Sequence, residues 1–205
     1  MKAGGILKSK TTIEFQGKPF TIECEDIFLR EYLLEDLDAI CKITHEPEIR
    51  HFLPGWDVSR EQRREWLTDY EMPGNRRFLQ AVQDGGDVGQ LRLRLAIVLK
   101  ETGECIGWCN SGPKEELHPP NREIMYGISN RYYNKGYATQ AVRALIRYLF
   151  RNTRERELNA IAVVHNHASN KVIQKCGFAY IGEIELEQEQ YHHYKLCDGS
   201  MNPDE

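Results

Sequence analysis

The chain has 205 residues, of which 40% are hydrophobic and 28% are charged, and its formal net charge is -4. This length fits one domain with a substantial core, and the composition is too apolar for a disordered protein. The charge shows no concentrated basic excess, which argues against nucleic-acid binding. The apolar runs are too short to span a membrane, and "MKAGGILKSK" lacks the core of a secretion signal. We therefore expect a cytoplasmic protein without a membrane partner.

The cysteines and histidines show no spacing typical of a metal site or a disulfide framework. The six cysteines include no CxxC pair, and we expect reduced thiols because disulfide frameworks belong to shorter secreted chains. Cys105 and Cys109 flank "IGW" in an expected strand, which is a poor arrangement for zinc. His165 and His167 share one face of a strand end without an evident third ligand. The sequence therefore predicts no metal site.

The first part of the chain predicts a strand followed by two helices. Within residues 1–24, apolar and polar residues alternate on both sides of "QGK", which indicates a hairpin or an extended N-terminal appendage. "DIFLREY" predicts a strand over 26–32, and "LLEDLDAICKITHE" has apolar residues at helical spacing. In "SREQRREWLTDYE", Ser59 followed by Gln62 is a capping-box pattern that predicts the start of the second helix.

From residue 77 onward the pattern changes to that of strands. "ETGE" is the expected hairpin turn between the second and third of them, and a short helix over 170–176 ends at Gly177. The expected strands span 78–83, 91–100, 104–112, 123–129, 158–169, 178–186 and 191–197. The last two should pair antiparallel. Together these elements predict a mixed α/β fold in one domain over 25–197, with a loose tail over 198–205.

The segment "NRYYNKGYA" connects the expected strand over 123–129 to a helix that begins near Thr139. The first N–H groups of a helix lack intrahelical partners and the helix dipole is positive there, so the loop suits a phosphate. Gly136 permits a positive φ or a close approach of a ligand, and Ala138 is small. Ordinary α/β connections share this pattern, so a plain loop stays an alternative. Lys135 precedes Gly136, which does not fit a nucleotide P-loop.

Three separated segments carry a resemblance to a known family. "EIMYGISNRYYNKGYATQA" resembles the acyl-CoA-binding segment of the GCN5-related N-acetyltransferases (GNAT), most closely the branch of ribosomal-protein N-terminal acetyltransferases. "NHASNKVIQKCGF" resembles the Asn-x-x-Ser segment of that branch, and "IFLREYLLEDLDAI" resembles its opening strand and helix. The three segments cover roughly residues 27–197 in the right order. The resemblance implies a mixed, mostly antiparallel sheet flanked by helices, with a splayed strand pair that binds acyl-CoA.

Four positions depart from the pattern of the wider superfamily. Tyr133 stands where Arg or Gln is preferred, and Asn134 replaces the common first glycine of the loop. Gln140 replaces a common glutamate. Ile173 stands where many members have the tyrosine that protonates the departing thiolate. The resemblance therefore implies backbone recognition in the loop and another source for that proton.

The resemblance implies that the loop binds the pyrophosphate of coenzyme A through backbone groups. The pantetheine arm is expected to run along the strand near Ile128, and a β-bulge in this strand is expected to open it from "AIAVV". The cosubstrate implied is acetyl-CoA, with no metal. The predicted cofactor-binding residues are Tyr126, Gly127, Ile128, Tyr133, Asn134, Lys135, Gly136, Tyr137, Ala138, Thr139 and Asn166.

Acyl transfer to an amine needs a neutral amine, a donor for the developing oxyanion and a proton for the leaving thiolate. Ser169 is the predicted acid because it matches the serine of the branch, and the alternative is an N-cap of the helix over 170–176. Glu123 is the predicted base, and the alternative is a solvated glutamate at a strand start. Asn166 could orient pantetheine or substrate, or finish a turn. A backbone N–H between Tyr126 and Ile128 would serve the oxyanion, as the family implies.

Further aromatic and charged side chains have plainer interpretations. Trp56, Trp66 and Tyr70 lie in the region that usually shapes the acceptor pocket of the family, although packing accounts for most such residues. Arginines 143, 147 and 151 repeat at four-residue spacing, which is typical of a solvated helix face. His192 and His193 are adjacent in the last strand and should point to opposite faces.

The leading hypothesis is an N-acetyltransferase that moves the acetyl group of acetyl-CoA to a primary amine by direct attack in a ternary complex. The acceptor could be a protein N-terminus, a polyamine or a small amino compound, because the loops that select it have no readable shape. The alternative is a catalytically silent acyl-CoA-binding sensor or interaction module. Family members often form homodimers, and the sequence leaves that alternative open.

Overall fold

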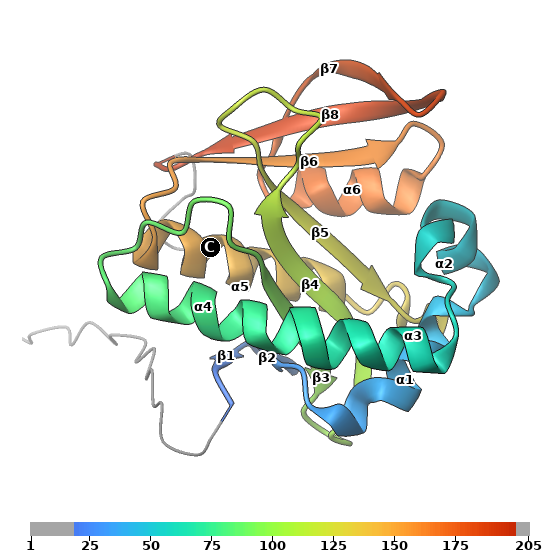
Figure 1. Ribbon diagram of the computed structural model, residues 1–205. Coiled ribbons are helices and arrows are strands. Elements are labelled where there is room, and N and C mark those ends of the chain that lie inside the picture. The colour runs from blue at the N-terminus through green and yellow to red at the C-terminus, as the bar shows by residue number, and fades with distance from the viewer. Residues whose placement is uncertain (1–18, 200–205) are drawn as a thin grey trace, which may run out of the picture.

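The computed structural model describes residues 19–199, which form a mixed sheet of eight strands in the order β1-β2-β3-β4-β5-β6-β8-β7 (Figure 1). The strands are β1 (Thr21–Glu23), β2 (Ile27–Glu31), β3 (Leu93–Leu99), β4 (Cys105–Pro113), β5 (Arg122–Ile128), β6 (Glu157–Val163), β7 (Ala179–Leu186) and β8 (Glu189–Cys197). Neighbours pair antiparallel except for β5 and β6, which are parallel. The predicted mixed, mostly antiparallel fold is confirmed.

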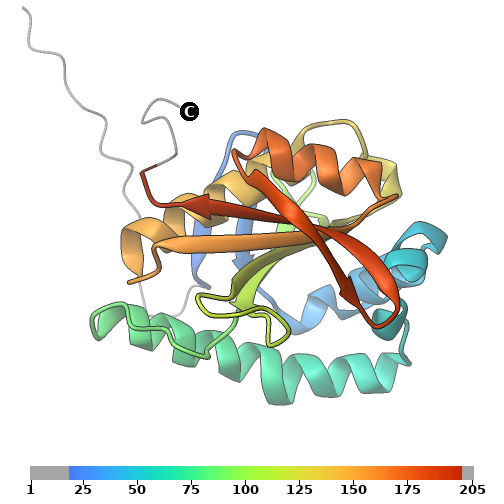
Figure 2. The ribbon, with the colours of Figure 1, turned by 90° about the horizontal axis from the view of Figure 1, so that it is seen from above.

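Helices cover both faces of this sheet. They are η1 (Leu34–Asp36), α1 (Leu37–Thr44), α2 (Pro47–Phe52), η2 (Pro54–Trp56), α3 (Arg60–Glu65), η3 (Trp66–Glu71), α4 (Met72–Gln83), η4 (Asn130–Tyr132), α5 (Tyr137–Asn152) and α6 (His167–Lys175). Figure 2 shows α4 on one side of the sheet and α5 and α6 on the other. Within residues 19–199, no helix is long and apolar enough to cross a membrane.

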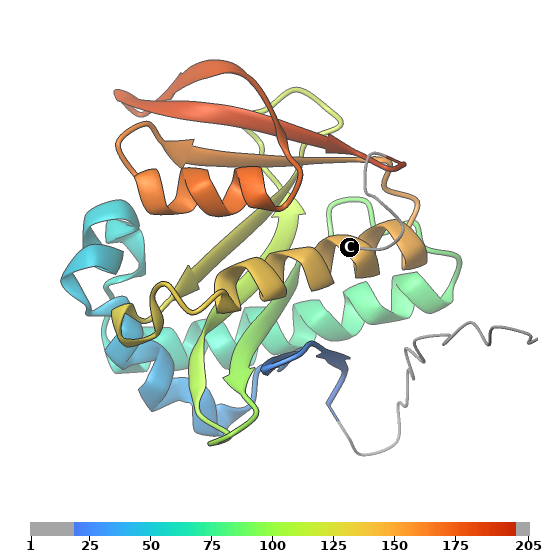
Figure 3. The same ribbon diagram turned by 180° about the vertical axis from the view of Figure 1, so that it is seen from behind.

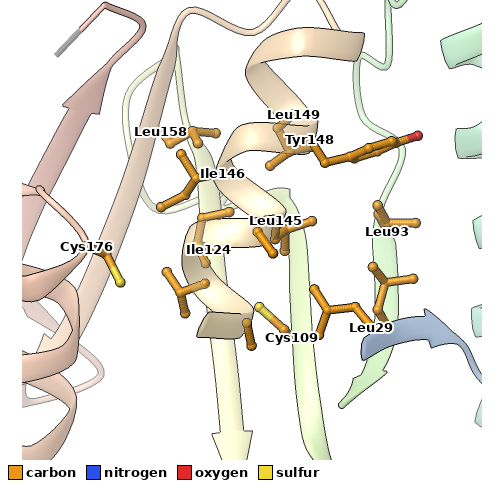
Figure 4. Packing of buried hydrophobic residues seen from close by; sticks show 14 of the residues in the cluster. Leu29, Leu93, Cys109, Ile124, Leu145, Ile146, Tyr148, Leu149, Leu158 and Cys176 are labelled. Carbon is orange, nitrogen blue, oxygen red and sulfur yellow. The ribbon is translucent and has the colours of Figure 1, made fainter. Parts of the chain in front are cut away.

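The larger core lies between α5 and the sheet. Apolar residues recur along α5 at helical spacing, and Leu145 and Leu149 are completely buried. Figure 4 shows Leu145 beside Ile124 and Cys109 of the strands, and Leu149 further along the helix. Burial of one such leucine contributes about 1.5–3 kcal/mol, so this face holds α5 firmly in place.

A second core lies on the opposite face, under α1, η3 and α4. Leu67 and Ile40 are completely buried there, together with Trp108 of β4. Trp108 rests on the backbone of β5, because a Cβ atom built on Gly127 would lie 2.4 Å from the indole ring. Position 127 therefore requires glycine, because any side chain there would collide with the Trp108 indole.

The predicted strand over 78–83 is wrong, because these residues form the second half of α4. Phe78, Leu79 and Val82 are all buried, which is the helical spacing of one apolar face and not the alternation of a strand. Asn75 joins this helix to β3 through the backbone of Arg94. Its Nδ2 donates to Arg94 O at 2.7 Å, and its Oδ1 accepts from Arg94 N at 2.8 Å.

The predicted helix start at Ser59 is confirmed. Ser59 Oγ accepts from Gln62 N at 3.2 Å, which caps α3. The side chain of Gln62 bonds to Glu65 at 3.1 Å and does not return to the cap, so half of the predicted capping box forms. The helix then continues through the π-helical segment η3 into α4.

The start of the sheet lies on the N-terminal side of the predicted domain boundary at residue 25. Strand β1 pairs with β2, and Phe20 is buried against Tyr148 with ring centroids 4.9 Å apart. Residues 19–24 are thus part of the folded unit. The predicted hairpin around "QGK" and the last six residues of the predicted tail lie outside the described residues.

Strands β5 and β6 splay apart, as Figures 1 and 3 show. In the part of the chain that the structure describes, their pairing is recorded at one position, Glu123 opposite Asn159. The bulge expected in β5 is a wrong prediction, since β5 pairs with β4 in one continuous register. In the described residues, register shifts lie instead between β3 and β4 at Ile97/Val98 and between β7 and β8 at Tyr180/Gly182. The opening therefore comes from divergence of the two strands.

Candidate functional site

The glycine loop turns into α5 two residues earlier than predicted. Asn134 and Gly136 have positive φ angles of 61° and 82°, and the helix begins at Tyr137. Gly136 is the N-cap of α5 and has no side chain that could accept a hydrogen bond. The first N–H groups of α5 therefore point out of the N-terminal end of the helix without a capping side chain. Gly136 is exposed, and a Cβ there would meet nothing within 4 Å. This end of α5 offers N–H donors and a positive dipole to an anion.

Side chains on both sides of the loop fix its position. Arg131 Nη2 and the Tyr132 hydroxyl donate to the two oxygens of Glu104 at 2.6 and 2.7 Å. The bonds from Tyr132 and Arg131 lower the pKa of this carboxyl group, which therefore stays ionised at neutral pH. Ser129 Oγ and the N–H of Asn130 donate to Glu46 at 2.6 and 2.7 Å. The loop is thus tied to the β3–β4 turn and to the start of α2.

The free edge of β5 faces the opening toward β6. Ser129 N–H donates to Ile106 O at 2.9 Å, which directs this residue's N–H toward β4. Successive residues of a strand direct their N–H groups to alternate edges. The N–H groups of Tyr126 and Ile128, which belong to the other set, therefore point toward β6, where the two strands have separated.

Ser169 and Tyr126 meet across this opening. The Tyr126 hydroxyl donates to Ser169 O at 3.0 Å and lies 2.9 Å from Ser169 Oγ. Burial raises the pKa of the Tyr126 phenol, so the group stays protonated. The sequence had suggested a cofactor contact and a backbone oxyanion donor for Tyr126, but no role for its hydroxyl group. The available signal was its alternation with Ile124 and Ile128, which places all three on the face covered by helices α5 and α6.

Asn166, and not Ser169, caps the short helix. Asn166 Oδ1 accepts from Ser169 N at 3.0 Å, so α6 begins at His167 and Ser169 lies in its first turn. The predicted N-cap role of Ser169 is therefore wrong. Ile173, which stands where the resemblance would place a tyrosine, is a buried core residue with 2% exposure.

Glu123 lies on the opposite face of β5 from Tyr126. Burial raises the pKa of its carboxyl group to about 7, against the lowering effects of Lys114 and Arg92. A carboxyl group with this pKa changes its protonation state near neutral pH, which is the range in which a general base works.

Asn159, opposite Glu123 where β5 and β6 pair, is a buried residue that sequence reasoning missed. Its Nδ2 donates to Pro120 O at 3.0 Å, and its Oδ1 lies 2.8 Å from His193 Nε2. It therefore joins the loop before β5 to strands β6 and β8. His192 points the other way, with Nδ1 3.0 Å from Asn170 Oδ1, so the two histidines occupy opposite faces as predicted. Burial lowers the pKa of His193, which favours the neutral ring.

The aromatic residues of the α2–α4 region divide into packed and exposed ones. Trp56 stacks on Trp108 with centroids 4.8 Å apart and planes at 12°, and the guanidinium of Arg63 lies 5.5 Å from the Trp56 ring and 5.9 Å from Trp66. Tyr70 is 65% exposed. These contacts place Trp56 over Trp108, the β4 side chain that lies against Gly127 of β5.

Two other predicted groups have roles in packing. Arg143, which was expected on a solvated face, donates to Lys175 O at 2.7 Å and so joins α5 to α6. His165 lies beside His51 and Phe52, with ring centroids 5.7 Å away in both cases. Among residues 19–199, no group of three or more His, Cys, Asp or Glu residues could hold a metal ion.

Comparisons of the sequence with known proteins find acetyltransferases. A family model described as an acetyltransferase (GNAT) domain matches residues 26–179. The uncharacterized N-acetyltransferase p20 of Bacillus licheniformis is 29% identical over 161 residues, which cover 77% of this chain and 82% of that protein. The uncharacterized protein YkkB of Bacillus subtilis is 33% identical over 81 residues, covering 40% of this chain and 47% of YkkB.

Solved structures share the fold at low sequence identity. A GNAT acetyltransferase from Bacillus anthracis has a TM-score of 0.69 at 18% identity, covering 86% of this chain and 98% of that one. RimL, a ribosomal L7/L12 α-N-protein acetyltransferase solved with coenzyme A, has a TM-score of 0.66 at 18% identity, covering 88% and 99%. AAC(6')-Ib, solved with acetyl-CoA, has a TM-score of 0.67 at 18% identity, covering 86% and 96%.

Proposed function

Because the chain belongs to the GNAT family of acetyltransferases, we propose that it moves the acetyl group of acetyl-CoA to a primary amine by direct attack within a ternary complex. The observation that supports this most directly is the opening between β5 and β6, together with the Tyr126–Ser169 pair across it and the N-terminus of α5. RimL and AAC(6')-Ib were solved with coenzyme A and acetyl-CoA on the same fold. A cytoplasmic location and a homodimer stay predictions.

The N-terminus of α5 is the proposed seat of the coenzyme A pyrophosphate. The N–H groups of Tyr137, Ala138 and Thr139 lie in the first helical turn, and the open space at Gly136 lets an anion approach the backbone. Residues 133–135 would line the same turn. Lys135 supplies a cation beside it, held 5.4 Å from the Tyr132 ring. This is backbone recognition, as the departures at Tyr133 and Asn134 imply.

The free edge of β5 is the proposed track of the pantetheine arm. An extended ligand can add to an exposed strand edge through backbone hydrogen bonds. The N–H groups of Tyr126 and Ile128 point to this edge, and either can donate to the oxygen of the tetrahedral intermediate. Gly127 between them keeps the strand against Trp108.

Ser169 is the proposed acid for the thiolate. When the amine nitrogen bonds to the carbonyl carbon, the bond from that carbon to sulfur breaks and the sulfur takes a proton. Tyr126 Oη lies 2.9 Å from Ser169 Oγ, so its proton can turn from Ser169 O to Oγ; in that arrangement the proton of Ser169 is available for the sulfur. Asn166 acts here as a positioning residue, since its bond to Ser169 N sets the start of α6.

Glu123 is the proposed base that takes a proton from the attacking amine, directly or through a water. Its face of β5 is the one that carries Gly127 and lies toward Trp108 and Trp56, so the acceptor would approach from the α1–α4 side. The acetyl-CoA edge and the acceptor face thus meet along β5.

A panel of amines tests the proposal. Purified protein is incubated with acetyl-CoA and peptide N-termini, polyamines or small amino compounds, and acetylated acceptor is detected by mass spectrometry. Binding of acetyl-CoA measured by calorimetry, together with no acetylated product from any acceptor, would favour the silent binding module instead.

Replacement of the proposed acid gives the first specific prediction. Ser169→Ala should lower kcat about 100-fold, the range of a general acid, and leave acetyl-CoA affinity nearly unchanged. Tyr126→Phe, which keeps the serine and removes its partner, should lower kcat less. An unchanged rate in Ser169→Ala removes this residue from the mechanism.

A further inference from the structure

The sheet face that carries Glu123 also holds a buried polar cluster, which we call the arginine cluster: Arg63, Glu71 and Arg94. Arg63 Nη2 lies 2.6 Å from one oxygen of Glu71, and Arg94 Nε lies 3.9 Å from the other. The side chains of Arg63 and Glu71 are 1% and 7% exposed, and that of Arg94 is 25% exposed. Two guanidinium groups share one carboxylate, so the cluster has an excess of one positive charge.

Four polar atoms around this cluster have no hydrogen-bond partner in the part of the chain that the structure describes. They are Arg63 Nε, Tyr32 Oη, Trp108 Nε1 and Asn110 Nδ2. Each can donate a hydrogen, and an unsatisfied buried donor costs about 1–3 kcal/mol. A set of donors beside an excess positive charge fits an oxygen-bearing anion better than a second cation.

The four residues lie together. The Arg63 guanidinium is 6.0 Å from the Tyr32 ring and 5.5 Å from the Trp56 ring, which stacks on Trp108. Asn110 is directly opposite Arg94 in the β3–β4 pairing. Asn110 Oδ1 already accepts from Leu95 N at 3.2 Å, which orients the amide so that Nδ2 is the remaining group.

The charge of Arg94 is poorly compensated. Burial lowers the pKa of Arg94, and nearby Arg92 acts in the same direction, while Glu71 opposes both. An additional negative charge near this guanidinium would therefore be stabilised.

The cluster lies at a defined distance from the reacting strand. Asn110 pairs with Met125 of β5 and with Arg94 of β3, so β4 alone separates Arg94 from β5. Two interstrand spacings amount to about 10 Å, and Glu123 lies two residues from Met125 along β5, so Arg94 and Glu123 are about 12 Å apart. An extended chain covers about 3.4 Å per residue, so about three to four residues bridge that distance, or fewer with an acidic side chain.

We propose that the acceptor is an amine that also carries a carboxylate, with the amine near Glu123 on β5 and the carboxylate bound by the arginine cluster through Arg94. This rests on the proposed function and adds the class of acceptor to it. Peptides with an acidic residue at position 2 or 3 have the required spacing. The carboxylate of Glu123 then faces the amine of the acceptor, and the positive arginine cluster faces its carboxylate.

Matched peptides test the proposal. The probes are the amides Ser-Asp-Ala-Ala and Ser-Ala-Asp-Ala and their Asn counterparts, which differ only in one carboxylate. With the wild type, kcat/KM should be at least about tenfold higher for an Asp peptide than for its Asn partner, because the charge-assisted contact adds to binding. Arg94→Gln should reduce this preference to less than about threefold, and Arg94→Lys should restore part of it.

Arg64→Gln is the matched control. It removes one arginine charge from the exposed face of α3, next to the cluster in sequence, and should leave the preference unchanged. Thermal melting of each variant shows whether it is folded.

Binding is measured as well as turnover, so that the two proposals can fail separately. Calorimetry with coenzyme A present compares each Asp peptide with its Asn partner. Tighter binding of an Asp peptide that Arg94→Gln abolishes supports the acceptor class even without turnover, and turnover failure then counts against the proposed function. Equal binding of both peptides, absence of binding, or a preference that survives in Arg94→Gln overturns the acceptor class, whereas acetylation of the Asn peptides would leave the proposed function standing.

Discussion

Glu123 has a carboxyl group whose ionisation the fold moves into the neutral range. Burial raises its pKa to about 7, from an ordinary value near 4.5. As a base it must be ionised, so activity should rise with pH through about 7 and level off above it. Glu123→Gln should lower kcat/KM about 100-fold at pH 8, measured as initial rates across pH 5–9.

The same shift has an opposite effect on stability. The folded state binds the Glu123 proton more tightly than the unfolded state, so between about pH 4.5 and 7 the free energy of unfolding falls as pH rises. In Glu123→Gln this part of the fall should be missing from urea unfolding curves. An equal fall in both proteins, or a rate profile without a step near 7, contradicts the assignment.

The role of a single residue could be predicted from the sequence where that role depends on the residue's own backbone conformation. The positive φ of Gly136 and its place before a helix follow from one loop. The role of Ser169 was uncertain because both Asn166 and Ser169 are good caps, and the choice depends on which residue begins α6. The contact with Tyr126, 43 residues away, had no local signal.

Among the elements, α5 carries the most specific prediction. Gly136 has φ 82° and an open Cβ position, so Gly136→Ala adds backbone strain of about 1–2 kcal/mol without a clash. If the loop relaxes away from this conformation, the first N–H groups of α5 lose their common direction. Calorimetry should show acetyl-CoA affinity at least about tenfold weaker.

Gly89→Ala provides the control for this change. Gly89 also has a positive φ, 40°, and its Cβ would make only an ordinary contact with Asp87. It lies before β3, away from the loop, so a similar loss of stability with unchanged acetyl-CoA affinity is expected. If both variants bind acetyl-CoA as the wild type does, the proposed phosphate seat at α5 is wrong.

Elements with a clear period were predicted well, and short apolar runs were not. The stripe along α5 and the alternation in β5 gave correct types. Residues 78–83 were predicted as a strand because six residues of this kind fit both periods. The helical choice depends on α4 as a whole, which begins at Met72 and is joined to β3 by Asn75.

For the molecule as a whole, Asn159 joins the two halves of the divided sheet. It is completely buried and bonded to the β5 side through Pro120 and to β8 through His193. Asn159→Ala should lower the free energy of unfolding by about 2–4 kcal/mol, since it leaves buried polar groups unpaired. Urea unfolding measures this loss, and acetyl-CoA affinity should fall with it because the opening is no longer held.

Asn152→Ala is the comparison for Asn159→Ala. Asn152 donates to Tyr148 O, four residues earlier in α5, at a half-buried position, so its loss should cost less than about 1 kcal/mol. Equal losses in the two variants would show that Asn159 has no special role between the halves.

The sequence by itself determined the elements with strong periods, the glycine turn before α5 and the family, because each of these depends on residues close together in the chain or on segments in a fixed order. The tertiary structure decided the pKa of Glu123, the Tyr126–Ser169 contact and the arginine cluster. These depend on burial and on contacts between distant segments, and both exist only once the strands and helices have packed.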